Sequence, residues 1–133
     1  MKLTKAIPAD YVDARGAITK ILDDGKTAIR STLLITSRKG AVRANHYHKT
    51  DSHHVYMLSG KMEYSEHPVG SDARGAETVI VEAGDLLYTP PMVVHVMRFI
   101  EDSAFLALAT NSRHQEAYEE DTVRVAPSAE PGP

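Results

Sequence analysis

Residues 43–54 of this chain read Arg-Ala-Asn-His-Tyr-His-Lys-Thr-Asp-Ser-His-His. Four of the seven histidines of the protein therefore fall within nine positions. Successive side chains of a β-strand point to opposite faces, so a strand here places His46 and His48 on one face with Tyr47 on the other. Two imidazoles on one face can both reach a single ion. The stretch indicates a metal site built on a strand.

A second segment extends this site. His95 follows the turn-forming run 84–91, which reads Gly-Asp-Leu-Leu-Tyr-Thr-Pro-Pro. The chain has no cysteine, so imidazole and carboxylate groups must supply the ligands. The two segments together predict one site assembled from separate strands. Whether His53 or His54 joins them is open, because a shift of one residue in strand register exchanges the two faces.

Short apolar or β-branched runs alternate with turn chemistry along most of the chain. Turns of the Lys-Gly, Ser-Gly and Pro-Pro kind separate runs at a spacing of about ten residues, which is typical of an antiparallel sandwich or barrel of the jelly-roll kind. We therefore expect an all-β, single-domain jelly-roll β-barrel. The expected strands are residues 17–22, 28–36, 54–58, 61–64, 78–81, 93–99 and 104–109.

The domain prediction covers residues 1–126, with an amino-terminal arm at one end. Residues 112–125 are acidic and are expected to form a short helix or an arm on the barrel, and residues 127–133 are expected to be a disordered tail. A length of 133 residues with 42% hydrophobic and 25% charged content is typical of one soluble globular domain.

Charge and hydropathy exclude several classes of partner. The net charge is −3 and the pI is about 6.1, and the basic residues are dispersed, so we expect no nucleic acid partner. No segment approaches the roughly 20 apolar residues of a membrane helix, and no signal peptide is evident. We expect a cytoplasmic protein without a membrane partner, and the lack of cysteine fits a reducing compartment.

The spacing of the first histidines resembles a known signature. Gly40, five residues, His46-Tyr47-His48, four residues, His53, six residues and Gly60 is similar to the first signature of the cupin superfamily, in which glutamate usually stands at the position of His53. The resemblance covers roughly residues 28–110.

The second cupin signature is matched in part. Gly84, Pro90 and His95 occupy its expected positions. Met92 stands where that signature has a second glycine, and Phe99 stands where asparagine is common. The loop before His95 is therefore expected to be shaped differently from that of other cupins.

The resemblance implies a small barrel whose mouth holds His46, His48, His53 and His95 around a divalent transition metal: iron, nickel, copper or zinc. Four neutral ligands would leave the full 2+ charge on the ion, which favours bound anions, enolates or a water of lowered pKa. Related sugar isomerases use the first histidine pair as acid and base without any ion, so His46 and His48 are also catalytic candidates.

Other polar residues of the strands are candidates for the substrate site. A buried tyrosine seeks a hydrogen-bond partner, and among the strand tyrosines we assign Tyr56 as the catalytic acid and Tyr88 to substrate binding. Arg43 and Arg98 are strand cations able to hold a carboxylate or phosphate in fork geometry. Asp51 and Glu63 are candidate carboxylate bases or ligands.

Three short motifs are similar to cupins that act on nucleotide-linked oxo-sugars, the 3,5-epimerases and 3,4-ketoisomerases. They are residues 13–16 (Asp-Ala-Arg-Gly), the Arg-x-x-His-x-His-Lys run at 43–49, and the closing segments 105–109 and 115–121. The implied function is a metal-dependent enzyme on a small oxygenated, carbonyl-containing substrate, with an oxo-sugar isomerase or epimerase as a specific candidate, through proton abstraction beside the carbonyl. The best-matched isomerases do not depend on a metal.

Two alternative functions stay open. The first is a cupin dioxygenase or a zinc-dependent cyclase of polyketide-like chains, and the second is a non-enzymatic ligand-binding cupin. Cupins commonly pair their exposed sheet edges, so the resemblance also implies a homodimer.

Overall fold

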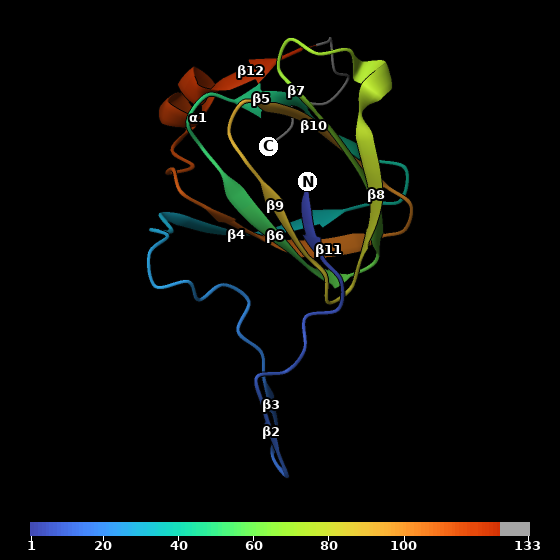
Figure 1. The fold of residues 1–133 in the computed structure, drawn as a ribbon, viewed down its shortest axis with the longest axis vertical. Helices are drawn as coiled ribbons and strands as arrows, with labels where there is room; N and C mark the ends of the chain where they lie inside the picture. Colours follow the sequence, from blue (N-terminus) through green and yellow to red (C-terminus); the bar gives the residue numbers. More distant parts are fainter. Residues whose placement is uncertain (126–133) are drawn as a thin grey trace.

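The computed structural model describes residues 1–125, so the predicted tail at 127–133 lies outside the described residues. Two five-stranded antiparallel sheets face one another (Figure 1). The first sheet has the order β1 (Lys2–Thr4), β9 (Leu86–Thr89), β6 (His53–Ser59), β11 (Ser103–Ala109) and β4 (Ser31–Ser37). The second has the order β12 (Thr122–Arg124), β5 (Val42–His48), β10 (Val93–Phe99), β7 (Lys61–Pro68) and β8 (Glu77–Glu82).

Four further elements lie outside these sheets. Strands β2 (Tyr11–Asp13) and β3 (Gly16–Ile18) form a separate hairpin that projects away from the two sheets (Figure 1). A 3₁₀ turn, η1 (Ala73–Gly75), precedes β8, and the helix α1 (Gln115–Asp121) precedes β12. No helix within residues 1–125 has the length and apolar character that a membrane crossing requires.

Alternating side chains of both sheets form the core. On β6 the inward residues Val55 and Met57 are fully buried, as are Met62 and Tyr64 on β7. The rings of Phe99 and Phe105 stack between the sheets with their centroids 5.9 Å apart. The period-2 burial that the sequence shows is therefore the pattern that joins the two sheets.

The predicted all-β jelly roll is confirmed, with one difference. No ladder between described residues joins the two sheets, so the domain is a two-sheet sandwich rather than a closed barrel. Each sheet has one three-residue edge strand, β1 or β12, and one longer edge strand, β4 or β8.

Individual elements follow the predictions to different degrees. The strand predicted at 93–99 is β10, and the helix lies inside the predicted segment 112–125. The run predicted at 17–22 is a strand only as far as Ile18, in the projecting hairpin. Strand β9 is missing from the predicted strands because the Gly-Asp and Pro-Pro turns on either side dominate that stretch of sequence.

Candidate functional site

The four predicted ligand histidines converge between the sheets. His46 and His48 come from β5, His53 from β6 and His95 from β10. The ring centroid of His46 lies 4.6 Å from that of His48 and 4.7 Å from that of His95. One ring nitrogen from each of these three residues lies within 4.8 Å of the others. The ring centroid of His53 lies 5.4 Å from that of His95, and His53 forms a second group with His48 and Asp51 in which the ligand atoms lie within 4.8 Å of one another.

A β-bulge on β5 brings His46 opposite His95. Ala44 and Asn45 both have positive φ angles, 70° and 61°. The ladder between β5 and β10 shifts here, because His95 pairs with His46 while the next residue, Val96, pairs with Ala44. Asn45 is thus the extra residue of the bulge. Two adjacent non-glycine residues in the left-handed region are unusual and occur mostly beside functional sites.

Strand register decides between the two adjacent histidines of β6. His53 points inward with the buried residues Val55 and Met57, and its ring faces the other histidines. His54 lies on the opposite face, where its ring is 4.8 Å from that of Tyr88. The structure brings His53, and not His54, to the histidine group.

The loop before His95 keeps a left-handed turn at the non-glycine position. Met92, where the cupin signature has glycine, has a φ angle of 61°. Its backbone N–H donates to the carbonyl of His48 at 2.8 Å, and its own carbonyl accepts from the N–H of Val69 at 3.2 Å. The loop therefore ties β10 to the ligand strand in spite of the missing glycine.

Contacts on the outer side of the rings orient two of the histidines. Nδ1 of His95 lies 3.2 Å from the carbonyl oxygen of Val93. Nδ1 of His48 lies 3.3 Å from Oγ1 of Thr122 and 3.6 Å from a carboxylate oxygen of Asp121. In metal sites such contacts fix the tautomer of the imidazole and leave Nε2 to face the ion.

Burial keeps the histidines neutral. It lowers the pKa of His46 strongly, and repulsion from His95 and His48 adds to the effect. Burial likewise lowers the pKa of His95 to about 4, that of His53 well below its usual value, and that of His48, although two nearby carboxylates oppose the change. At neutral pH each ring therefore offers a lone pair. This donor set fits a divalent transition metal.

Unpartnered buried atoms gather at the same end of the sandwich. Buried polar atoms in native proteins almost always have a hydrogen-bond partner. Within residues 1–125 the buried side-chain atoms without one are Nδ1 and Nε2 of His46, Oε1 of Glu66, Nη1 of Arg113 and Oη of Tyr118. Glu66 is paired in register with His95, so every one of these atoms lies near the histidines.

A pocket opens beside the histidine group. Its volume is about 40 Å³, a few times the roughly 10–15 Å³ that one water needs. His48, His53 and His95 line it together with Asp51, Arg113 and Tyr118, and apolar side chains of β4, β10 and β11 form the remaining wall. The pocket accepts a small, partly apolar molecule.

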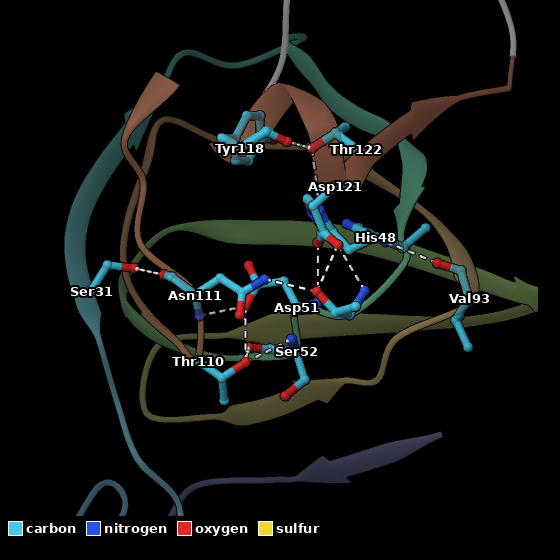
Figure 2. A network of polar contacts seen from close by, with 12 residues as sticks. Ser31, His48, Asp51, Ser52, Val93, Thr110, Asn111, Tyr118, Asp121 and Thr122 are labelled. Atoms are coloured by element: carbon cyan, nitrogen blue, oxygen red, sulfur yellow. Dashed lines mark hydrogen bonds and ion pairs between the residues drawn. The ribbon is translucent and has the colours of Figure 1, made fainter. Parts of the chain in front are cut away.

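A carboxylate network fixes the loop between β5 and β6. Asp51 is buried, and one of its oxygens accepts from the hydroxyl of Thr110 and the N–H of Asn111, each at 3.0 Å. Asp121 at the end of α1 accepts from the N–H of Thr50 at 2.8 Å and from that of Asp51 at 3.0 Å. Figure 2 shows Asp121 between this loop and His48.

The other predicted site residues lie outside the pocket. Tyr56 is on the outer face of β6 with His54, and Tyr88 contacts His54. The guanidinium of Arg43 donates to Oγ of Ser37 and to the carbonyl of Thr36. Arg98 is exposed and faces Glu63. The structure does not bring these four residues to the histidines.

Sequence reasoning did not place Arg113 or Tyr118 in the pocket. Both belong to the segment after β11, which folds back over the open side of the histidine group. One sequence feature favours such a role: Tyr118 is the only aromatic residue of an otherwise polar helix.

Comparisons with known proteins agree with this architecture. The model of the cupin domain family matches residues 33–111, and no curated protein matches the chain in sequence. A 3,4-ketoisomerase from Helicobacter canadensis superposes with a TM-score of 0.73 at 20% identity, over 93% of this chain and 90% of that one. QdtA, a sugar 3,4-ketoisomerase from Thermoanaerobacterium thermosaccharolyticum solved with TDP, gives 0.71 at 21% identity, over 93% and 87%.

A 3,5-epimerase, RmlC from Legionella pneumophila, gives a TM-score of 0.68 at 19% identity, over 86% of this chain and 68% of that one. At such identities the likeness shows the fold. The family match spans more than half of the chain and includes all four converging histidines. The protein therefore belongs to the cupin domain family.

Proposed function

We propose that the protein is a metal-dependent enzyme that moves a proton beside the carbonyl group of a small oxygenated substrate. The observation that carries this proposal is His46, whose two ring nitrogens are both buried and without a partner. An imidazole in that state is costly unless a ligand engages it. His48 and His95 lie beside it as further neutral donors, and His53 lies beside both of them.

A divalent ion held by His46, His48, His53 and His95 would act as a Lewis acid toward a carbonyl oxygen. Asp51 is the carboxylate that lines the pocket beside His48 and His53. In this proposal it accepts the proton from the carbon next to the carbonyl. Where that carbon carries a hydroxyl, Asp51 returns the proton to the former carbonyl carbon while the hydroxyl proton moves to the former carbonyl oxygen, so that the carbonyl and hydroxyl groups exchange places; otherwise the proton returns to the same carbon. The apolar wall of the pocket limits the access of water to the reacting carbon.

A metal-free oxo-sugar isomerase is the second candidate. The solved structures of similar fold include sugar 3,4-ketoisomerases and 3,5-epimerases, and His46 and His48 would then act as the acid and base. The two unpartnered ring nitrogens of His46 favour the first candidate.

Metal analysis tests the proposal directly. Purified protein should contain about one equivalent of iron, nickel, copper or zinc, and His46→Ala should lose it. His54→Ala removes an imidazole from the outer face of the same strand and should keep the metal. Protein that binds none of the four metals after reconstitution would leave the metal-free isomerase.

Deuterium exchange then separates the reaction classes. Metal-loaded protein should catalyse exchange of the hydrogens next to the carbonyl of acetylacetone or a small keto acid in D₂O, followed by NMR. Consumption of dioxygen with the same compounds would instead indicate a cupin dioxygenase. Binding without exchange or oxygen uptake would indicate a ligand-binding cupin.

We also propose a homodimer in the cytoplasm. The hairpin of β2 and β3 exposes Tyr11, Val12 and Ile18, each more than half exposed, and an isolated two-stranded hairpin is marginally stable in water. A second copy of the chain that covers this hairpin would bury those side chains. Light scattering should give the dimer mass, and Val12→Asp should shift it to the monomer.

The lack of cysteine supports a reducing compartment.

A further inference from the structure

Arg113 is half-buried, and its positive charge has no counter-charge within residues 1–125. Within residues 1–125 it forms no ion pair, and its Nη1 is buried without a hydrogen-bond partner. Its guanidinium carbon lies 3.6 Å from the centroid of the Tyr118 ring. Stacking on the aromatic face holds the guanidinium in place but leaves its N–H groups unsatisfied. A buried guanidinium donor of this kind favours an anionic ligand.

Tyr118 offers a second free donor at the same place. It is 7% exposed, and its hydroxyl is buried without a partner. Its ring lies 5.5 Å from that of His48 and 6.5 Å from that of His46. Arg113 and Tyr118 both line the pocket that the histidines line. Two unsatisfied donors therefore lie next to the proposed metal ligands.

We infer that Arg113 and Tyr118 bind the carboxylate of a small oxo acid whose carbonyl group faces the histidines. The inference rests on the proposed function and names the substrate class of that site. The residues are specificity determinants: they orient the substrate and leave the proton transfer to the groups on the sandwich. The carboxylate would supply acceptors for the free Nη1 and Oη atoms at the α1 side of the pocket.

Charge favours a carboxylate over a phosphate. A planar carboxylate matches the fork of a guanidinium. Asp51 lines the same pocket, and its negative charge disfavours an anion with several charges. A diphosphate of the kind carried by nucleotide sugars is both larger and more highly charged.

Calorimetric titration with pyruvate tests the inference, with methyl pyruvate as the uncharged counterpart. Arg113→Gln should weaken pyruvate binding about tenfold, which is the loss of a hydrogen bond to a charged group. Tyr118→Phe keeps the ring under Arg113 and should weaken it about threefold. Methyl pyruvate should bind both variants as it binds the wild type.

Two further variants serve as controls. Arg38→Gln removes the same charge from an exposed turn and should bind pyruvate like the wild type. Arg113→Lys keeps the charge without the fork and should bind with intermediate affinity, which covers the case in which the glutamine variant fails to fold. The melting curve of each variant shows whether it is folded.

Titrations with and without metal separate the inference from the proposed function. The ratio of affinities between the wild type and Arg113→Gln should be similar in both forms. Metal binding with no effect of Arg113 overturns the inference alone, whereas an effect of Arg113 in a protein that binds no metal overturns the proposed function alone. The inference also fails if wild-type protein does not bind pyruvate, if Arg38→Gln weakens binding equally, or if pyrophosphate binds more tightly than pyruvate.

Discussion

The two ends of the sandwich differ in whether their buried polar groups have hydrogen-bond partners. At the end opposite the histidines, Asp85 is almost fully buried and all its interactions are made. One carboxylate oxygen accepts from the N–H of Ala6 at 2.8 Å, and the other accepts from the N–H of Glu82 at 2.7 Å and from the ammonium of Lys5. At the histidine end, four buried side chains keep atoms without partners.

Ser103 and Gly60 lie at the same end as Asp85, where polar groups are hydrogen-bonded and the backbone is closely packed. Oγ of Ser103 accepts from the N–H of Lys61 at 3.1 Å and donates to the carbonyl of Glu101 at 2.8 Å. Gly60 has a φ angle of 88°, and a Cβ atom there would lie 2.2 Å from that same Oγ. Only glycine allows this approach.

This difference indicates that the Asp85 end of the sandwich contributes stability and that the histidine end is suited to binding. Satisfied polar groups contribute to the free energy of folding, whereas unsatisfied ones cost free energy until a ligand engages them. One fold carries both because the same strands run from one end to the other.

The largest expected effect is that of metal on the histidine end. Zinc-loaded protein should be more stable than chelator-treated protein by about 4 kcal/mol when free zinc exceeds its Kd a thousandfold. Urea unfolding in the two conditions measures the difference, which His46→Ala should abolish and His54→Ala should retain. Equal stability of zinc-loaded and chelator-treated protein would show that metal does not satisfy the unpartnered groups at the histidine end, and the proposed difference between the two ends would be wrong.

Asp85→Asn tests the end opposite the histidines. It should lower the free energy of unfolding by roughly 3 kcal/mol. Burial raises the pKa of Asp85, but the bonds from Lys5 and two backbone N–H groups outweigh it and leave the pKa lowered. A lowered pKa contributes stability above the unfolded value of about 3.9 that is lost as the pH falls through the folded value.

Urea unfolding at several pH values checks this prediction. The gap between the wild type and Asp85→Asn should therefore be widest near neutral pH and should narrow below pH about 3.9. A gap that is constant with pH would show that packing, rather than the charge, makes Asp85 stabilising.

Asp121→Asn acts on the link between α1 and the histidine end. It weakens the bonds to the loop at Thr50 and Asp51 and the contact with His48. We expect a cost of about 1–2 kcal/mol and a loss of metal affinity of about tenfold or more. Competition with a chelator measures the affinity. A loss of stability with unchanged metal affinity would restrict Asp121 to a role in folding.

The smallest effect is expected at Met92, in the loop before His95. Its side chain is 48% exposed and its φ angle is positive. Met92→Gly should remove the strain of a left-handed backbone at a non-glycine residue, which stabilises the folded state. Glycine also increases the conformational freedom of the unfolded chain, so the net gain in stability should be about 0.5 kcal/mol. Thermal unfolding beside Met92→Ala, which keeps the strain, checks this. A loss of stability would mean that the side chain contributes packing.

Much of the fold was predictable from local patterns. Alternation along residues 93–99 and the apolar run at 104–109 both identified strands, because alternate burial leaves a direct record in the sequence. The short strands β1 and β9 were not predicted, since three or four residues next to Gly and Pro carry too little pattern. Strand β2 was also missed, and the run predicted at 17–22 overlaps only the last two residues of β3, because only the turn residues of this hairpin stand out.

The candidate site divides in the same way. Spacing alone identified His46, His48 and His95, since the first pair shares one face of a strand. The choice of His53 over His54 depended on how β6 pairs with its neighbouring strands. The spacing of residues along the sequence does not reveal that pairing.

The sequence by itself determined the fold class and the histidine-bearing segments of the site, because alternation and clustering are local properties of the chain. Only the tertiary structure decided which side chains meet that set. Arg113 and Tyr118 come to the pocket because α1 folds back over the sandwich, and Arg43 and Arg98 lie outside it because of the faces they occupy. These placements depend on contacts between residues far apart in the chain, and such contacts leave no periodic pattern in the sequence.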